Sequence, residues 1–143
     1  MPARTLMLRD GRELRIDSLP ASLDDSVQQS RSHSRSRSHV VLVPAFNEVE
    51  LEQVTSLLGE LIALGCKELC CVGPEAELLH DTLDEILVQQ GFIEVVTTWH
   101  TDYLDACEYF LLAAGGREGA LLALIAAHPE LVALIEHGVW ERE

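Results

Sequence analysis

One short apolar run constrains the fold of this chain more than any other stretch. Residues 39–47 read His-Val-Val-Leu-Val-Pro-Ala-Phe-Asn, with β-branched residues near the start. β-Branched residues favour a strand, and an apolar run without polar alternation is typical of a strand that is buried on both faces. Asn47 can cap a following helix, because Glu50 stands three residues later in a capping-box arrangement. We therefore interpret residues 40–45 as the central strand of a sheet.

Strands and amphipathic helices alternate after this run. Apolar residues recur at helical spacing in three stretches, and each lies beside a short strand-like run. In chain order the predicted elements cover residues 40–45, 48–64, 68–72, 74–90, 92–98 and 102–114. Such alternation implies parallel strands joined by right-handed crossovers. It predicts a small three-layer α/β fold with a Rossmann-like or flavodoxin-like parallel sheet of strand order 2-1-3, in which residues 40–45 lie in the middle.

The two ends of the chain add further elements. Residues 5–16 are expected to form a β-hairpin around Asp10-Gly11, a dipeptide that suits a two-residue type I′ turn. Near the C-terminus, residues 118–127 and 129–137 are predicted to form one kinked helix or two short ones. Proline disrupts a helix, so we expect the break at Pro129, and Gly138 is expected to end the second segment. The length of 143 residues fits one domain.

Charge is distributed unevenly between two parts of the chain. Residues 1–38 carry seven arginines against five acidic residues, whereas residues 39–143 carry three basic residues against 19 acidic ones. Residues 19–38 are expected to be a flexible Ser/Arg-rich connection, since residues 30–38 alternate mainly Ser and Arg. The acidic remainder would repel nucleic acid and anionic lipid and would favour a basic partner.

The cellular location is predicted from what the sequence lacks. The N-terminus has no apolar signal-peptide region, and no uninterrupted apolar stretch is long enough to span a membrane. The four cysteines, at positions 66, 70, 71 and 107, have no spacing typical of a disulfide framework. We therefore expect a cytoplasmic protein with reduced thiols.

The best candidate for a ligand site lies beyond the carboxyl ends of the predicted strands, where open parallel sheets bind ligands. The residues expected to line it are Asn47, Glu48, Glu75, Trp99, His100 and Asp102. A simpler interpretation remains open, because Asn47 and Asp102 could act only as helix caps while His100 lies in a surface loop.

Several chemistries have little support. The first predicted strand leads into a segment that is rich in glutamate and has no glycine, so it would not hold a phosphate group. His80 and Asp84, four residues apart on one helix, could reach a metal ion together with His100 and Asp102, but no recognisable ligand spacing is present. Cys107 with His100 and Asp102 contains the residue types of a nucleophilic site, yet Cys107 is expected in the core. The sequence therefore predicts no cofactor.

Three functional hypotheses follow. The first is a non-catalytic module that binds a basic protein through acidic residues, by analogy with immunity proteins and antitoxin-like inhibitors, which are often small and acidic. Its expected contact residues are Glu77, Asp81, Asp84, Glu85 and Trp140. The second is a small enzyme or ligand binder that uses the strand-end site around His100. The third is an oligomeric subunit joined through apolar C-terminal helices. Its expected contact residues are Leu121, Leu122, Leu124, Ile125, Leu131 and Leu134.

Overall fold

The computed structural model describes residues 4–19 and 38–141, and it has an α/β fold built on a mostly parallel sheet of six strands. Residues 20–37 of the predicted Ser/Arg-rich connection lie outside the described residues. The strands are β1 (Arg4–Met7), β2 (Glu13–Ile16), β3 (His39–Pro44), β4 (Cys66–Val72), β5 (Val96–His100) and β6 (Ala120–Ala123). The helices are α2 (Glu48–Leu64), α3 (Ala76–Gln90), α4 (Tyr103–Leu112), the short 3-10 helix η1 (Ala114–Arg117) and α5 (Pro129–Glu141).

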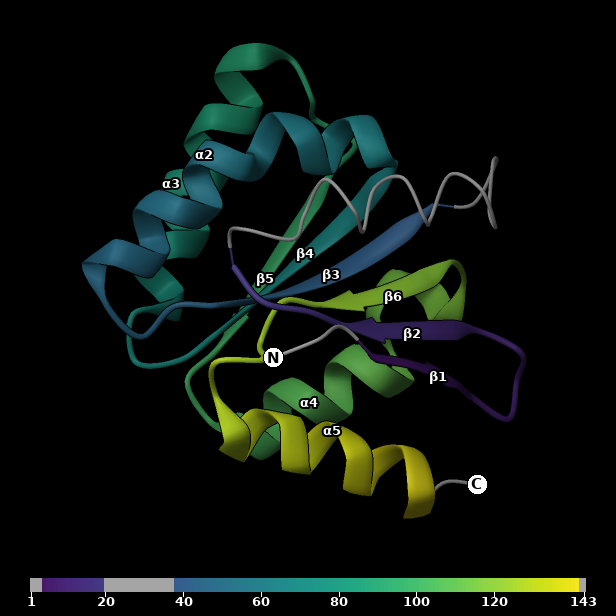
Figure 1. Cartoon of the computed structure of the whole chain (residues 1–143). Helices are drawn as coiled ribbons and strands as arrows, with labels where there is room; N and C mark the ends of the chain where they lie inside the picture. The colour runs from purple at the N-terminus through teal and green to yellow at the C-terminus, as the bar shows by residue number, and fades with distance from the viewer. Residues whose placement is uncertain (1–3, 20–37, 142–143) are drawn as a thin grey trace.

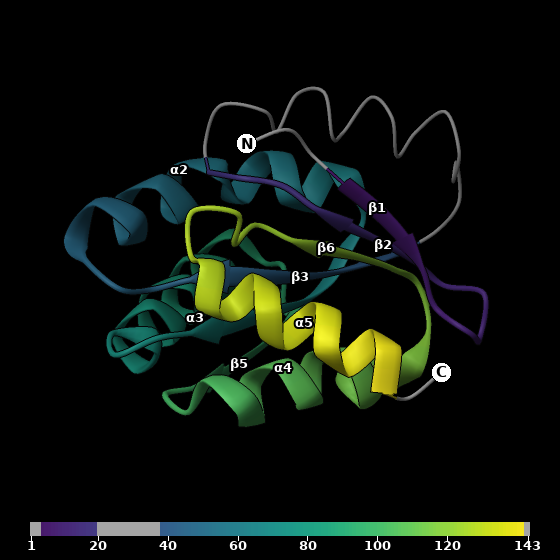
Figure 2. The ribbon, with the colours of Figure 1, turned by 60° about the horizontal axis from the view of Figure 1, so that its bottom comes forward.

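The sheet is covered on both faces, which gives three layers. Helices α2 and α3 pack on one face, and α4 and α5 pack on the other (Figure 1). Figure 2 shows α5 running alongside α4 on the second face. Side chains alternate along β3, so Val41 and Val43 join the core under α2 and α3 while Val40 and Leu42 join the core under α4 and α5. Within the described residues, no helix combines the length and apolarity needed to cross a membrane.

The strand order is β1-β2-β6-β3-β4-β5, so the predicted order 2-1-3 is only approximately right. Strand β3 is fully buried inside the sheet, as predicted, and β4 lies beside it. The neighbour of β3 on its other side is β6, however, and β5 lies at the edge beyond β4. The hairpin extends the sheet at the opposite edge, because β2 pairs in parallel with β6 while β1 pairs antiparallel with β2.

Residues 118–127 do not form the helix that their sequence predicts. Residues 120–123 form β6 instead, and its four residues are all buried. Leucine and alanine favour helices intrinsically, but pairing with β2 and β3 on both sides overrides that local preference. The apolar surface predicted for oligomer contacts is therefore unavailable there. Leu121, Leu122, Leu124, Ile125 and Leu131 are at most 1% exposed, and Leu134 is partly buried.

Smaller corrections concern the ends of elements. Strand β5 covers Val96–His100 rather than residues 92–98, and Ile93 is 78% exposed in the preceding turn. Helix α3 begins at Ala76, two residues after Pro74. Helix α5 begins at Pro129 and continues through Gly138, where a side chain would meet Leu111 Cδ1 on α4 at 2.6 Å. This glycine therefore allows the two helices to approach closely instead of ending one of them.

The hairpin turn also differs from the predicted type I′ turn. Leu8 N–H donates to the carbonyl of Arg12, and Gly11 N–H donates to the carbonyl of Leu8. The loop therefore has three residues, and only Gly11 has a positive φ, of 91°. This arrangement matches a type I turn followed by a left-handed glycine, which is the common alternative for hairpins of this length.

Candidate functional site

An acidic groove lies between the amino-terminal halves of α2 and α3, at the carboxyl edge of the sheet. Its volume is about 730 Å³, and its lining residues are Asn47, Glu48, Leu51, Glu52, Thr55, Ser56, Glu75, Leu78 and Thr82. Three of these nine residues are glutamates, and none is basic. The groove brings together Asn47, Glu48 and Glu75, three of the residues predicted for the strand-end site.

Asn47 has a structural role in this groove. Its Oδ1 accepts a hydrogen bond from Glu50 N at 3.0 Å, so the residue caps α2 as the sequence predicts. Asp102 caps α4 in the same way, through a 2.8 Å bond from Asp105 N to its Oδ1. The simpler interpretation of these two residues as helix caps is therefore confirmed.

The other half of the predicted strand-end cluster lies elsewhere. Trp99 and His100 are the last residues of the edge strand β5, and Trp99 is 39% exposed. The His100 ring lies against the Tyr109 ring of α4, with 5.3 Å between centroids, and its Nδ1 is buried without a hydrogen-bond partner among the described residues. His100 pairs with Val72 and faces the α4 side of the sheet, whereas the groove lies between α2 and α3 on the other side. Trp99 pairs with Cys71 and faces the α3 side, but it does not line the groove. The predicted cluster is therefore not brought together.

A second feature of the carboxyl edge was missed by the sequence analysis. The chain moves outward from β3 to β4 and β5 and then returns to β6 on the other side of β3. The strand order therefore reverses between β3 and β6, which is the place where open α/β sheets bind ligands. Glu50 and His128 meet there, with 2.5 Å between Glu50 Oε2 and His128 Nε2. Glu50 Oε1 also accepts a hydrogen bond from Phe46 N at 2.9 Å.

Aromatic rings surround this pair. Phe46 stacks on His128 with 4.0 Å between ring centroids, and Tyr103 lies 5.4 Å from Phe46. A crevice of about 320 Å³ is lined by Phe46, Tyr103, His128, Pro129, Glu130 and Leu131. The Glu50–His128 pair can hold and move a proton, and the rings can contact an apolar ligand. A nucleophilic thiol or aliphatic hydroxyl is absent from this lining.

The predicted metal-binding residues do not come together. His80 Nδ1 lies 2.9 Å from Asp81 Oδ1. Asp84 instead accepts a hydrogen bond from Thr97 at 3.4 Å. In the part of the chain that the structure describes, no group of three or more His, Cys, Asp or Glu side chains could hold a metal ion.

The cysteines are buried, free thiols, as the sequence predicts. Cys70 and Cys71 face opposite sides of the sheet, one in each core. Burial raises the pKa of Cys71 to about 12, and it raises the pKa of Cys107 to about 12 as well. Thiols with such pKa values are poor nucleophiles at neutral pH, because only the thiolate reacts.

Glu68, near the amino end of β4, is the most enclosed acidic residue of the α4 face and is 4% exposed. Its carboxylate accepts hydrogen bonds from Tyr109 OH at 2.6 Å, Thr98 Oγ1 at 3.1 Å and Gly115 N at 2.8 Å. Burial, followed by the hydrogen bond to Glu68, raises the pKa of Tyr109. Because it accepts three hydrogen bonds inside the protein, this carboxylate fastens α4 and η1 to strands β4 and β5 of the sheet. The sequence signal for it was a glutamate directly before the apolar run Leu-Cys-Cys-Val of the same strand.

The four residues predicted on the outer face of α3, Glu77, Asp81, Asp84 and Glu85, are all exposed. The side chain of Trp140 lies outside the described part of the structure. None of the four lines the groove, but all belong to the helix that forms one of its walls, and they add to the negative charge of that helix.

Comparison with curated proteins finds no match. A family model described as a domain of unknown function (DUF7684) matches residues 18–130. This span contains the acidic groove and the Glu50–His128 pair, and it begins after the N-terminal hairpin. Because the match covers more than half of the sequence, the chain belongs to the DUF7684 family.

Proposed function

We propose that the chain is a non-catalytic protein-binding module that holds a basic segment of a partner protein in the groove between α2 and α3. The observation that carries the proposal is the composition of the groove. Glu48, Glu52 and Glu75 line it without a basic side chain among them, and none of the three forms an ion pair with another described residue. No described side chain neutralises these charges, so the groove suits the lysine or arginine side chains of a partner.

The groove also offers apolar surface. Leu78 is 53% exposed and lines the groove together with Leu51. A docking site with an apolar centre and a charged rim is the usual anatomy of a protein interface. The expected ligand is thus a basic segment with one apolar side chain, which contacts Leu78 while its cations contact the glutamates.

The wider charge distribution supports the same partner. Residues 39–143 carry a net charge of −16, and four exposed acids belong to α3, the helix that forms one wall of the groove. Such a field accelerates association with a basic protein and disfavours acidic competitors. Inhibition of a basic protein, in the manner of an immunity protein or antitoxin, is the role that we propose for this binding.

The test is affinity capture from a lysate of the native host with three forms of the protein. The groove variant carries Glu48→Gln, Glu52→Gln and Glu75→Gln. The matched control removes the same charge from exposed positions outside the groove, through Glu60→Gln, Glu94→Gln and Glu118→Gln. Capture is compared at about 0.1 M and about 1 M salt, where the screening length falls from about 10 Å to about 3 Å.

A basic protein that wild type and control retain at low salt, and that the groove variant releases, is the expected result. Leu78→Ser should weaken the same complex without changing net charge. Equal retention by all three forms, or a partner that high salt does not release, would contradict the proposal. Circular dichroism of each variant verifies that the fold is intact.

The Glu50–His128 crevice supports a second candidate, a small-ligand site. The observation in its favour is the stacking of Phe46 on His128 at the reversal point of the sheet. This candidate replaces the His100 site as the place to look for a ligand, because neither the groove nor the crevice is lined by His100. Screening of metabolites by NMR should shift the ring protons of His128, and a screen that leaves them unmoved would exclude this candidate.

A further inference from the structure

A third cavity lies where the hairpin loop meets α4 and α5, away from both features of the carboxyl edge. Its volume is about 180 Å³, and it shares no lining residue with the groove or the crevice. The lining residues are Leu8, Arg9, Asp10, Arg12, Leu111, Leu112, Arg117, Gly138 and Val139. Three arginines against one carboxylate make this a basic pocket in a protein whose net charge is −14.

Arg12 is the central residue of the pocket, and it is only 8% exposed. Its Nε donates to Asp10 Oδ2 at 2.8 Å, and its Nη2 donates to the carbonyl oxygen of Leu111 at 2.7 Å. Its Nη1 is buried and has no hydrogen-bond partner among the described residues. A buried donor of a charged group is rarely left unpaired, so this guanidinium has unused capacity for an acceptor.

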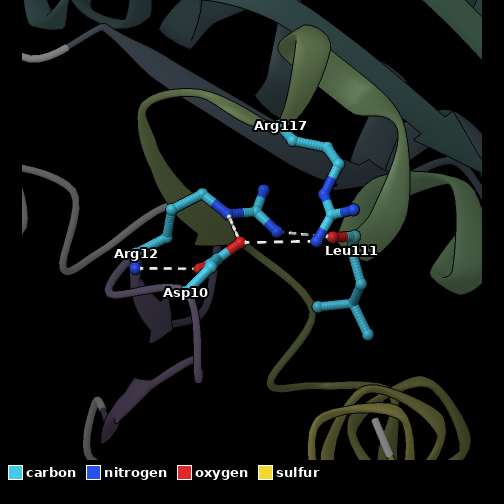
Figure 3. A network of polar contacts seen from close by, with 4 residues as sticks. All are labelled: Asp10, Arg12, Leu111 and Arg117. Atoms are coloured by element: carbon cyan, nitrogen blue, oxygen red, sulfur yellow. Dashed lines mark hydrogen bonds and ion pairs between the residues drawn. The ribbon is translucent and has the colours of Figure 1, made fainter. Parts of the chain in front are cut away.

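Arg117 approaches the same carboxylate from the other side of the pocket. Figure 3 shows the two guanidinium groups converging on Asp10, with 3.8 Å between Arg117 Nη2 and Asp10 Oδ2. Burial acts to raise the pKa of Asp10, but hydrogen bonds and the positive charges of Arg12 and Arg117 lower it overall. One ionised carboxylate therefore faces two permanent cations, and a net positive charge remains.

The backbone at Arg117 holds an unusual conformation. Arg117 has a φ of 64° and is the one non-glycine residue with positive φ in residues 4–19 and 38–141. It follows Gly115 and Gly116, which also have positive φ. Side chains rarely adopt this conformation, and strained residues of this kind cluster at binding sites. Glycine would adopt this φ without strain, so an arginine at position 117 has a local backbone cost.

We propose that this pocket binds a small organic anion, with its oxygens held by Arg12 and Arg117 and its apolar part against Leu8, Leu111 and Val139. Guanidinium groups pair with carboxylate and phosphate oxygens through directed hydrogen bonds. The volume of about 180 Å³ resembles that of cavities known to hold a benzene ring. The ligand class is therefore a compact carboxylate or phosphate with an apolar group of about ring size.

Benzoate is the first probe, because it combines a carboxylate with one ring. Titration into ¹⁵N-labelled protein, followed through the Nε–H signal of Arg12 and the amides of the hairpin loop, should give a saturable shift. Benzamide has the same shape without the charge, and inorganic phosphate has charge without the ring. Both should bind at least tenfold more weakly. The same titration with phenyl phosphate then compares a phosphate with a carboxylate on the same ring. The probe that binds more tightly shows which of the two anionic groups the pocket prefers.

Arg117→Gly is the decisive variant. It removes the exposed guanidinium and relieves the positive φ, so the fold should be as stable as wild type or more stable, while benzoate affinity falls at least tenfold. Arg4→Ala is the matched control, since Arg4 belongs to the same hairpin but pairs with Glu136. It should leave benzoate binding unchanged.

Two results would overturn the proposal. One is a benzoate titration without a saturable shift at Arg12, and the other is equal affinity in wild type and Arg117→Gly. Either would assign Arg12 and Arg117 only to fastening the hairpin loop to the end of α4. The groove variant described above should bind benzoate like wild type, because the two sites share no residue.

Discussion

Two adjacent glycines allow a sharp test of how the turn before β6 is built. Gly115 and Gly116 have nearly equal φ values of 63° and 66°, so an alanine at either position bears the same left-handed backbone penalty, about 1–2 kcal/mol. Their surroundings differ. A Cβ at Gly116 would meet nothing within 4 Å, whereas a Cβ at Gly115 would lie 2.4 Å from Val40 Cγ2 and 2.8 Å from Lys67 Cε.

The clash at Gly115 has no easy relief. Lys67 is a flexible chain and can move, but Val40 is fully buried in β3. Overpacking of a core residue costs about 1–3 kcal/mol. Displacing the turn would also strain the 2.8 Å hydrogen bond from Gly115 N to Glu68. We therefore expect Gly115→Ala to lower the free energy of unfolding by about 2–5 kcal/mol, and Gly116→Ala by about 1–2 kcal/mol.

Urea unfolding followed by circular dichroism measures the free energy of unfolding of both variants. The dependence of this free energy on urea concentration should be the same as in wild type. Gly59→Ala supplies a control of opposite sign, because Gly59 lies inside α2 with open space around it. Replacement there should stabilise the protein by up to about 1 kcal/mol. Equal losses for Gly115→Ala and Gly116→Ala would refute the reasoning, since the clash with Val40 would then have no energetic effect.

Three further predictions concern buried polar groups. Tyr109→Phe removes a donor from the buried carboxylate of Glu68 and should cost about 1.5–3 kcal/mol in urea unfolding; a loss below about 0.5 kcal/mol would mean that water replaces the hydroxyl. His128→Ala should lower stability by about 1–2 kcal/mol, because the Phe46 stack and the partner of Glu50 are both lost, and an unchanged melting temperature would contradict this. Burial raises the pKa of Cys71 to about 12, so its neutral thiol favours folding below about pH 8.5, and that contribution is lost as pH rises toward 12. The native thiol should resist Ellman's reagent at pH 8 until the protein is unfolded, and prompt labelling would show that Cys71 is accessible.

Much of the fold could be predicted because, in most elements, the local sequence pattern favours the same structure that packing in the sheet requires. The apolar run at β3 is buried on both faces, and Asn47 and Gly65 mark the ends of α2 through an N-terminal cap and a left-handed C-terminal residue. Strand β6 could not be predicted in this way. Its residues Ala-Leu-Leu-Ala favour a helix and show no alternation, because both faces of the strand are buried. Only pairing with β2 and β3 determines its conformation.

The candidate sites also differ in how far the sequence predicts them. Glu48 and Glu75 could be assigned to one groove because each follows the carboxyl end of a parallel strand. Glu50 and His128 are 78 residues apart, and Arg12 and Arg117 are 105 apart, so no local pattern relates them. The misassignment of β6 hid both pairs, since that strand determines where His128 and Arg117 lie relative to the rest of the sheet.

The position of β6 has a consequence for how the chain acquires its structure. The hairpin of β1 and β2 is made first in the sequence, yet it contacts the rest of the sheet through β6, which is made last among the strands. During synthesis the hairpin must wait for more than 100 residues before its neighbour leaves the ribosome, and a two-stranded hairpin alone is at best marginally stable. Closing this long-range pairing is entropically slow. Until it occurs, β3 exposes an unpaired apolar edge, so docking of β6 should be the step at which the nascent chain escapes aggregation.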